Sequence, residues 1–230
     1  MQANYVQRLR LTFRKFGPTR YIGHLDLARA LERSLNRAAI PVAYTQGFNR
    51  RPRMQFASPL PLGFISDCEL ADIWLTERVA PATAQEQIMS RMVPGIDIYD
   101  VTEVALDQPA LQTLTRAASY LVTLLDPVEP AALAGSVTAL LASPSLLRER
   151  RGKAYDLRPL VLNLCLQAGE EGNPGLAMSL ALLPGETGRP EAVLEALGID
   201  PQMARISRTA IVLAEPAVEP PPLTTAATGD

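Results

Sequence analysis

The chain has 230 residues, 47% of them hydrophobic and 20% charged, a globular composition compatible with one or two domains. No apolar run reaches the ~18 to 20 residues of a membrane-spanning helix. The first 14 residues lack the apolar core of a signal peptide. We therefore expect a cytoplasmic protein with no membrane partner, and we leave its oligomeric state open. The two cysteines, Cys68 and Cys165, lie far apart in strand-like segments, which favours buried, reduced thiols.

Basic residues gather at one end of a chain whose net charge is only −2. Residues 1–60 hold eleven Lys or Arg against two acids, whereas residues 61–230 hold eleven basic and 22 acidic residues. Such a block favours binding to a polyanion, chiefly RNA, or to an acidic partner surface. The alternative is that these arginines pair with acids supplied by the rest of the chain.

The first half predicts the element order β-α-β-β-α-β. Alternating apolar residues predict a strand over 6–13. After Gly17-Pro18, the apolar residues Leu25, Ala28, Leu31, Leu35 and Ala38 recur at intervals of three and four and predict an amphipathic helix. We then expect short strand pieces at 42–45 and 54–57, a strand over 68–77, a helix over 81–95 and a strand over 96–106.

The second half repeats this order without obvious residue identity. Its expected elements are a strand (119–126), a helix (129–143), two strands joined by a basic turn (146–168), a strand (175–183), a helix (189–198) and a strand (205–215). This pattern predicts an α+β fold of two tandem ferredoxin-like (split β-α-β) units with antiparallel sheets. The predicted division is a first unit (1–106), a linker (107–117), a second unit (118–215) and a disordered tail rich in Pro, Thr and Ala (216–230).

Motifs for common chemistry are missing. The sequence has no Walker A loop, no Gly-x-Gly-x-x-Gly and no Gly-x-Ser-x-Gly. One histidine and two separated cysteines predict no metal site and no cofactor held by this chain alone. The acid pairs Asp67/Glu69 and Asp97/Asp100 are typical of the solvated face of a sheet rather than of acid–base catalysis.

The single histidine, His24, lies at the predicted start of the first helix. A helix N-terminus carries free N–H donors and partial positive charge, which suits an anion and favours a neutral imidazole. Arg20 and Arg29 add charge nearby, and Asp26 is favourable in the first turn. Three roles stay open for His24, namely local capping or packing against Tyr21, contact with a ligand, and proton transfer.

A second cluster occupies the loop at residues 44–56. Its arginines surround a Gly/Pro turn, and its aromatic rings offer planes on which a base could stack. The alternative is a solvated hairpin tip with its aromatic rings turned inward. Together the two clusters give the predicted RNA- or anion-binding set: Arg20, Tyr21, His24, Arg29, Tyr44, Phe48, Asn49, Arg50, Arg51 and Arg53.

Residues 148–159 form a second basic turn, in which we expect Asp156 to pair with Arg158 or Arg151. This turn is either a secondary anion site or a solvated hairpin. Its basic residues are Arg148, Arg150, Arg151, Lys153 and Arg158.

Residues 20–75, with the later segments AYDLRP and RISRT, closely resemble an uncharacterised domain family associated with radical S-adenosylmethionine (SAM) proteins. The resemblance covers residues 6 to about 215, and Gly-His-Leu-Asp-Leu is its most specific part. It implies the stand-alone form of a domain found C-terminal to cobalamin-binding-type radical SAM proteins. The chain has no Cys-x-x-x-Cys-x-x-Cys, so a partner enzyme encoded nearby would carry the iron–sulfur cluster and S-adenosylmethionine. Where the family commonly has Pro-His-Pro-Lys, this chain reads Arg50-Arg51-Pro52-Arg53, which removes a second imidazole.

Three functions are consistent with these observations. The favoured hypothesis is a non-catalytic accessory module of a radical SAM system that binds RNA (tRNA or rRNA), or presents substrate, through its basic N-terminal face. The second is a metal-independent RNA endonuclease with His24 as general acid or base. The third is a protein-only adaptor that docks a radical SAM enzyme. The tandem arrangement is also similar to CRISPR RNA-processing endonucleases, an analogy of fold that does not fix function.

Overall fold

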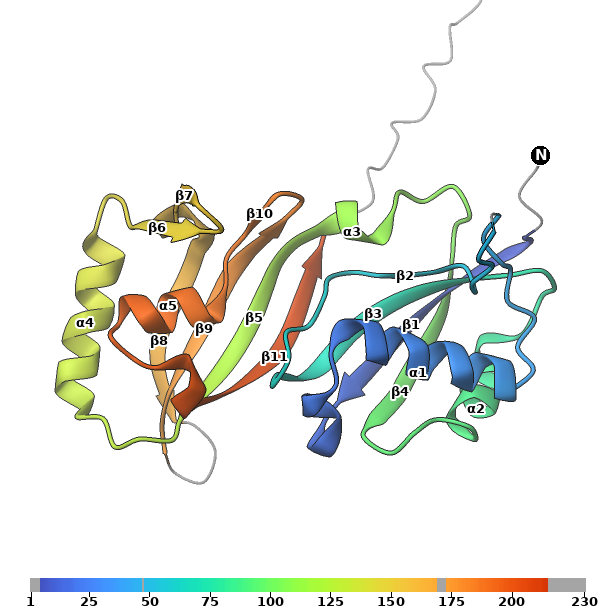
Figure 1. The fold of residues 1–230 in the computed structure, drawn as a ribbon, viewed down its shortest axis with the longest axis horizontal. Helices are drawn as coiled ribbons and strands as arrows, with labels where there is room; N and C mark the ends of the chain where they lie inside the picture. Colours follow the sequence, from blue (N-terminus) through green and yellow to red (C-terminus); the bar gives the residue numbers. More distant parts are fainter. Residues whose placement is uncertain (1–4, 47, 169–172, 215–230) are drawn as a thin grey trace, which may run out of the picture.

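A computed structural model of the chain describes residues 5–46, 48–168 and 173–214. It is a mixed α+β protein with a mostly antiparallel sheet and few helices (Figure 1). The predicted tail at 216–230 lies outside the described residues. None of the helices in the described ranges is both long and apolar enough to cross a membrane.

The first half builds its core between three long strands and two helices. Leu9, Leu11 and Phe13 alternate on the first strand and are buried against Leu31 and Leu35 of the first helix. The elements are β1 (Gln7–Lys15), the 3-10 helix η1 (Gly17–Tyr21), α1 (His24–Arg37), β2 (Met54–Phe56), β3 (Ile65–Leu75), α2 (Pro81–Met89) and β4 (Ile96–Val104).

The second half has its own core cluster, lined by Leu133 and Val137 of the helix at Pro130–Ala142 and by Val193 and Leu194 of the helix at Pro190–Ala196. Its elements are α3 (Leu111–Leu114), β5 (Thr115–Leu124), α4 (Pro130–Ala142), β6 (Leu147–Arg150), β7 (Lys153–Asp156), η2 (Arg158–Leu160), β8 (Val161–Ala168), β9 (Pro174–Leu183), β10 (Glu186–Thr187), α5 (Pro190–Ala196), η4 (Pro201–Met203) and β11 (Ala204–Leu213).

The described residues place nine strands in one continuous sheet. The strand order is β10-β9-β5-β11-β3-β1-β4, while β2 pairs with β3 and β8 pairs with β9. In each half, neighbouring strands pair antiparallel. The exception joins the halves, because β11 runs parallel to β3 over two register pairs, Ser207 with Ile65 and Arg208 with Ser66. The two sheets expected from the sequence are therefore one.

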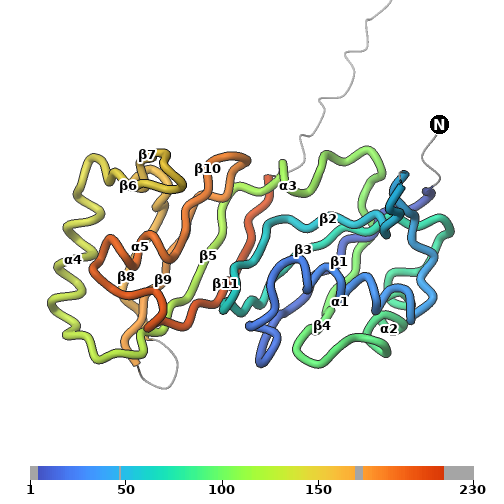
Figure 2. Tube along the Cα trace, viewed as in Figure 1, coloured from blue at the N-terminus to red at the C-terminus, as the bar shows by residue number. Residues whose placement is uncertain are grey.

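The segment between β2 and β3 strengthens this junction. It runs alongside β11 (Figure 2), and its Leu60 and Phe64 are buried in the core of the second half. Phe64 O accepts a hydrogen bond from the buried Lys15 Nζ at 3.3 Å. Burial lowers the pKa of Lys15, and the charge of Glu69 opposes this shift. Side chains of the first half thus complete the core of the second.

Two acids of β3 are buried, and for Glu69 this contradicts the expected solvated position. Glu69 is 1% exposed rather than on a solvated face, because it pairs with Arg208 of β11. Asp72 is fully buried and pairs with both Arg8 and Arg10. Two of the clustered N-terminal arginines therefore pair with an acid from the later sequence, as the alternative interpretation holds.

Several local predictions were wrong. Leu25 is 68% exposed, because the buried stripe of α1 passes through Leu27 and Leu31. Helix α2 ends at Met89, before the predicted residue 95, and residues 42–45 make only isolated bridges instead of a strand. Both thiols are free, but neither is fully buried: Cys68 is half-buried on β3, and Cys165 is exposed on β8, most of whose residues after Val161 face solvent. The short elements α3 and β10 were not predicted.

Candidate anion-binding groove

A groove of about 740 Å³ lies between α1, the segment 51–56 and residues 106–112. Helix α1 contributes residues from its first three turns, and Thr45 lies on the same lining as the segment 51–56. Residues just before α3 line the same groove. Its basic lining residues, with the histidine, are Arg8, His24, Arg29, Arg51 and Arg53.

Stacked planar groups form one wall of the groove. The Arg53 guanidinium lies 4.9 Å from the centre of the Trp74 ring and 4.6 Å from that of Tyr5. Arg8 lies 4.7 Å from the same Trp74 ring while its Nη2 pairs with Asp72 at 2.6 Å. A stacked guanidinium keeps its N–H edge available for a phosphate or a base edge. The wall therefore holds Arg53 in place for an anion.

Two further arginines of the lining, Arg29 and Arg51, are exposed to solvent. Arg29 is exposed and lies 3.1 Å from Asp26, a surface pair one helical turn apart that holds it only weakly. Arg51 is exposed, and its backbone N–H donates to Thr45 Oγ1 at 3.2 Å. Glu32 is an acid on the same lining, so cations outnumber acids there.

His24 is the first residue of α1 and faces this groove. Gly23 occupies the N-cap position, and the His24 ring contacts Phe56 edge to face at 5.0 Å, so the capping and Tyr21-packing interpretations do not describe it. Burial lowers the pKa of His24, opposed by the charge of Glu69. Its Nδ1 is buried with no hydrogen-bond partner among the described residues. The lowered pKa favours the neutral imidazole, and the ring has an unsatisfied nitrogen.

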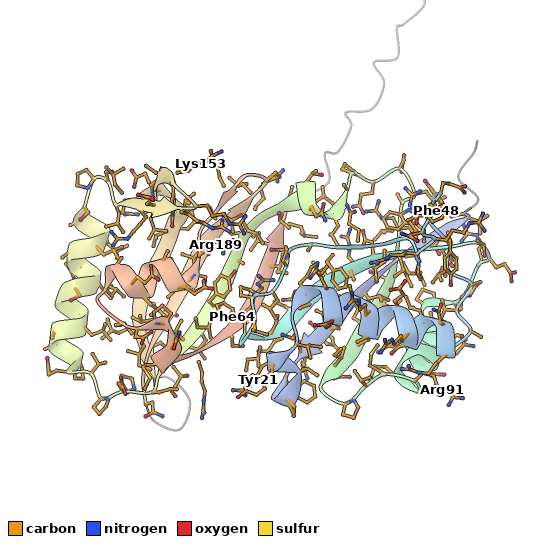
Figure 3. All side chains as sticks on the ribbon, viewed as in Figure 1. Tyr21, Phe48, Phe64, Arg91, Lys153 and Arg189 are labelled. Atoms are coloured by element: carbon orange, nitrogen blue, oxygen red, sulfur yellow. The ribbon has the colours of Figure 1, made fainter. Side chains whose placement is uncertain are left out.

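The structure divides the predicted RNA- or anion-binding set. His24, Arg29, Arg51 and Arg53 line the groove, whereas the other six do not. Figure 3 shows Tyr21 and Phe48 near opposite ends of α1. The remaining predicted residues lie as follows: Arg20 and Tyr21 in η1; Tyr44 half-exposed, with its hydroxyl donating to Asn36 Oδ1 at 3.0 Å; and Phe48, Asn49 and Arg50 exposed in the loop. The rings of Tyr44 and Phe48 are therefore not turned inward, whereas that of Phe56 is buried.

The second basic turn also separates into two groups. Arg150, Arg151 and Lys153 are exposed, whereas Arg158 turns inward and its guanidinium donates to Leu141 O and Val161 O. Arg148, at the base of the hairpin, donates to Leu147 O. Asp156 Oδ1 accepts the backbone N–H groups of Leu146 and Arg158, which hold the pKa of the carboxyl below its usual value. The predicted side-chain pairing of Asp156 with Arg158 or Arg151 is thus replaced by backbone hydrogen bonds.

Sequence reasoning missed Arg8, Trp74, Gln108 and Gln112 of the groove. Arg8 and Trp74 are register partners on β1 and β3, separated by 66 positions in the chain. The period-two pattern of both strands was visible, but their pairing register was not. Among the described residues, no group of three or more His, Cys, Asp or Glu could hold a metal ion.

Comparison with solved structures finds similarity, at 10% sequence identity, to chains of three complexes. A Cbf5-Nop10-Gar1 complex matches with a TM-score of 0.49 over 90% of this chain and 50% of that chain. An archaeal box H/ACA sRNP Nop10-Cbf5 complex gives 0.44 over 90% and 49%. An H/ACA RNP bound to a substrate RNA gives 0.43 over 87% and 47%. The chain spans about half the length of these chains.

Comparison with curated proteins finds no match. Comparison with protein families finds a match, and the matched region extends from β1 to the start of α5. The uncharacterized proteins conserved in bacteria known as DUF2344 match residues 8–190, and the chain belongs to that family.

Proposed function

We propose that this protein is a non-catalytic accessory module that binds RNA through the groove beside α1. The observation that carries the proposal is the convergence of Arg29 with Arg51 and Arg53, from two separate segments, on one groove. Arginine recognises phosphate through its planar set of donors, and the Trp74 and Tyr5 rings hold the Arg53 guanidinium in place by stacking. The groove amides of Gln108 and Gln112 add donors and acceptors for base edges.

The family resemblance supports a more specific role. It implies that the module acts in the cytoplasm with a radical SAM enzyme, which would supply the iron–sulfur cluster and S-adenosylmethionine. In this role the module would hold a tRNA or rRNA, or present another substrate, for that enzyme. Copurification of the two proteins that depends on RNA, and is lost after nuclease treatment, would support the role.

The strand order also supports two ferredoxin-like units, over 1–106 and 118–215. In the first half the strands lie in the order β4-β1-β3-β2, and in the second in the order β11-β5-β9-β8. Among these four strands of each half, counted in chain order, the first and third lie in the centre and the second and fourth at the sides. A helix follows the first and the third strand in each half, as in a split β-α-β unit.

The test is the salt dependence of RNA binding to single-arginine variants. Each phosphate contact on a single strand contributes roughly 0.7 to the slope of log affinity against log salt. Arg29→Ala and Arg51→Ala should each weaken binding and flatten this slope. Arg33→Ala is the matched control, because it removes the same charge from α1 but does not line the groove. Salt-independent binding, or an equal effect of Arg33→Ala, contradicts the proposal.

A second candidate function rests on His24. The ring lies on the groove lining, and burial lowers its pKa, which favours the neutral imidazole required of a general base toward a 2′-hydroxyl. A metal-independent endonuclease predicts RNA cleavage in EDTA that His24→Ala abolishes. Intact RNA after long incubation with the purified protein removes this function.

The third candidate, a protein-only adaptor, differs in its dependence on RNA. Its complex with the radical SAM enzyme survives nuclease treatment and is weakened by substitutions on the basic face. The same copurification experiment therefore separates the adaptor from the RNA-binding module.

A further inference from the structure

A second hollow, of about 890 Å³, lies at the other end of the molecule between the β6–β7 and β9–β10 hairpins. Leu160, Leu162 and Leu183 line it, so part of its surface is apolar. Tyr155 adds an aromatic ring. The cations around it come from three separate places in the chain: Arg116, Arg150, Arg151, Lys153 and Arg189.

The β6–β7 hairpin holds three of these cations in a tight turn. Its two-residue loop, Arg151-Gly152, has positive φ at both positions (51° and 75°), as in a type I′ turn, and Arg150 pairs with Lys153. The first position of such a turn favours Asn, Asp or Gly, so an arginine there is held in an unfavourable backbone region. Because Arg151 does not favour the turn, its presence there indicates that its side chain has a role of its own.

The other two cations are fixed by different elements. Arg189 precedes α5, and its Nε is buried with no hydrogen-bond partner in the described part of the chain. Arg116 Nη1 donates to two backbone carbonyls, which orients its guanidinium. Figure 3 shows Lys153 and Arg189 at the same end of the molecule. The acids on the lining are Glu186 and Asp156, and Asp156 Oδ1 already accepts two backbone N–H groups.

We propose that this hollow binds a nucleoside phosphate, with the base on the leucine and tyrosine surface and the phosphate on the cationic rim. Its volume lies within the range of small-molecule sites, and an apolar floor beside clustered arginines matches a ligand with a flat face and an anionic end. The ligand is either a free nucleotide or one nucleotide of an RNA strand. The hollow is distinct from the groove beside α1, although Arg116 in one and Gln112 in the other are only four residues apart.

The test is calorimetric titration of the full chain with adenosine 5′-monophosphate, adenosine and inorganic phosphate. The double variant Arg151→Asn/Lys153→Gln removes two charges and retains a residue favoured in the turn. The matched control is Arg148→Gln, on the same hairpin but not on the lining. We expect the nucleotide to bind at least about tenfold more tightly than phosphate or adenosine, and the double variant to lose about tenfold in affinity while the control does not.

Three outcomes would overturn the proposal: equal affinity for nucleotide and phosphate, unchanged affinity of the double variant, and no nucleotide binding at all. Competition with a single-stranded oligonucleotide separates the two sources. If the oligonucleotide displaces the nucleotide from the native protein, and displaces it less well from the double variant, the natural ligand is an RNA strand. If the oligonucleotide does not displace the nucleotide, the natural ligand is a free nucleotide. Because Arg29→Ala tests the groove alone, loss of one site leaves the other measurable.

Discussion

Arg208 of β11 and Glu69 of β3 form a buried ion pair beside the parallel junction of the two halves, with Arg208 Nη1 3.0 Å from Glu69 Oε1. Both side chains are 2% exposed. Arg208 also donates from Nη2 to Pro59 O and lies 5.6 Å from the centre of the Tyr120 ring. The pair thus connects β11 to β3, to the segment before β3 and to β5.

Removing one partner of this pair should destabilise the whole protein. Glu69→Gln leaves the buried Arg208 charge without its carboxylate, which typically costs about 3 to 5 kcal/mol. Arg78→Ala is the control, because it breaks an exposed ion pair with Glu103 worth about 1 kcal/mol or less. Urea unfolding followed by circular dichroism measures both, and a similar loss in the two variants would contradict the assignment.

His24 predicts how stability and binding respond to acid. Burial holds its folded-state pKa below the ordinary value of 6.5, so the unfolded chain takes up the proton first as the pH falls. The contribution of His24 is therefore complete above pH 6.5 and is lost as the pH falls toward the folded-state pKa. His24→Gln should abolish this component, as measured by thermal unfolding over a pH series.

The same protonation places a positive charge in the groove. RNA affinity should therefore rise as the pH falls through the folded-state pKa of His24, in the opposite direction to stability. An NMR titration of the single histidine gives that pKa independently. Identical pH profiles of RNA binding for the native protein and His24→Gln would show that the ring does not face the ligand.

The two thiols should differ in reactivity. Burial raises the pKa of Cys68 to about 11, despite a hydrogen bond with Ser66 that acts in the opposite direction, whereas Cys165 is exposed on β8. Because the thiolate is the nucleophile, iodoacetamide at pH 8 should modify Cys165 well before Cys68. Peptide mass spectrometry follows each site, and Cys165→Ser should remove the fast reaction.

Gly95 and Gly63 have similar backbone geometry but differ in the space available for a side chain. Both have positive φ (92° and 87°), but a Cβ on Gly95 would lie 2.6 Å from Thr19 Cγ2 and 2.8 Å from Phe16 O, while one on Gly63 meets nothing within 4 Å. Gly63→Ala should cost about 1 kcal/mol, the usual penalty for this backbone region. Gly95→Ala should cost clearly more in the same unfolding assay, and equal costs would exclude the contact.

The sequence predicted most elements because their apolar periods are local. The alternation in β1 and the stripe in α1 are both set by residues within a few positions, and they indicated the α+β class. Leu25 misled the helix register because it is apolar yet lies on the exposed groove side. The parallel contact of β11 with β3 rests on two register pairs about 140 positions apart, for which no local pattern exists.

The groove was partly predictable for the same reason. Arginines near a helix start and in a Gly/Pro loop are visible as charge, and His24, Arg29, Arg51 and Arg53 do line one groove. The charge pattern could not indicate how far apart the predicted residues lie in the fold. Arg20 and Tyr21 lie at one end of α1, and Phe48 lies near the other. The stacking of Arg53 on Trp74 depends on strand pairing and could not be derived from the sequence.

Because Leu60 and Phe64 insert into the core of the second half, the two halves depend on each other for folding. A fragment ending near residue 106 would present these side chains to water, and a fragment beginning there would lack them. Neither piece is then a free-standing folding unit, although each contains a full set of strands. Two such fragments, mixed, would assemble into one sheet, and the intact chain would melt in a single cooperative step.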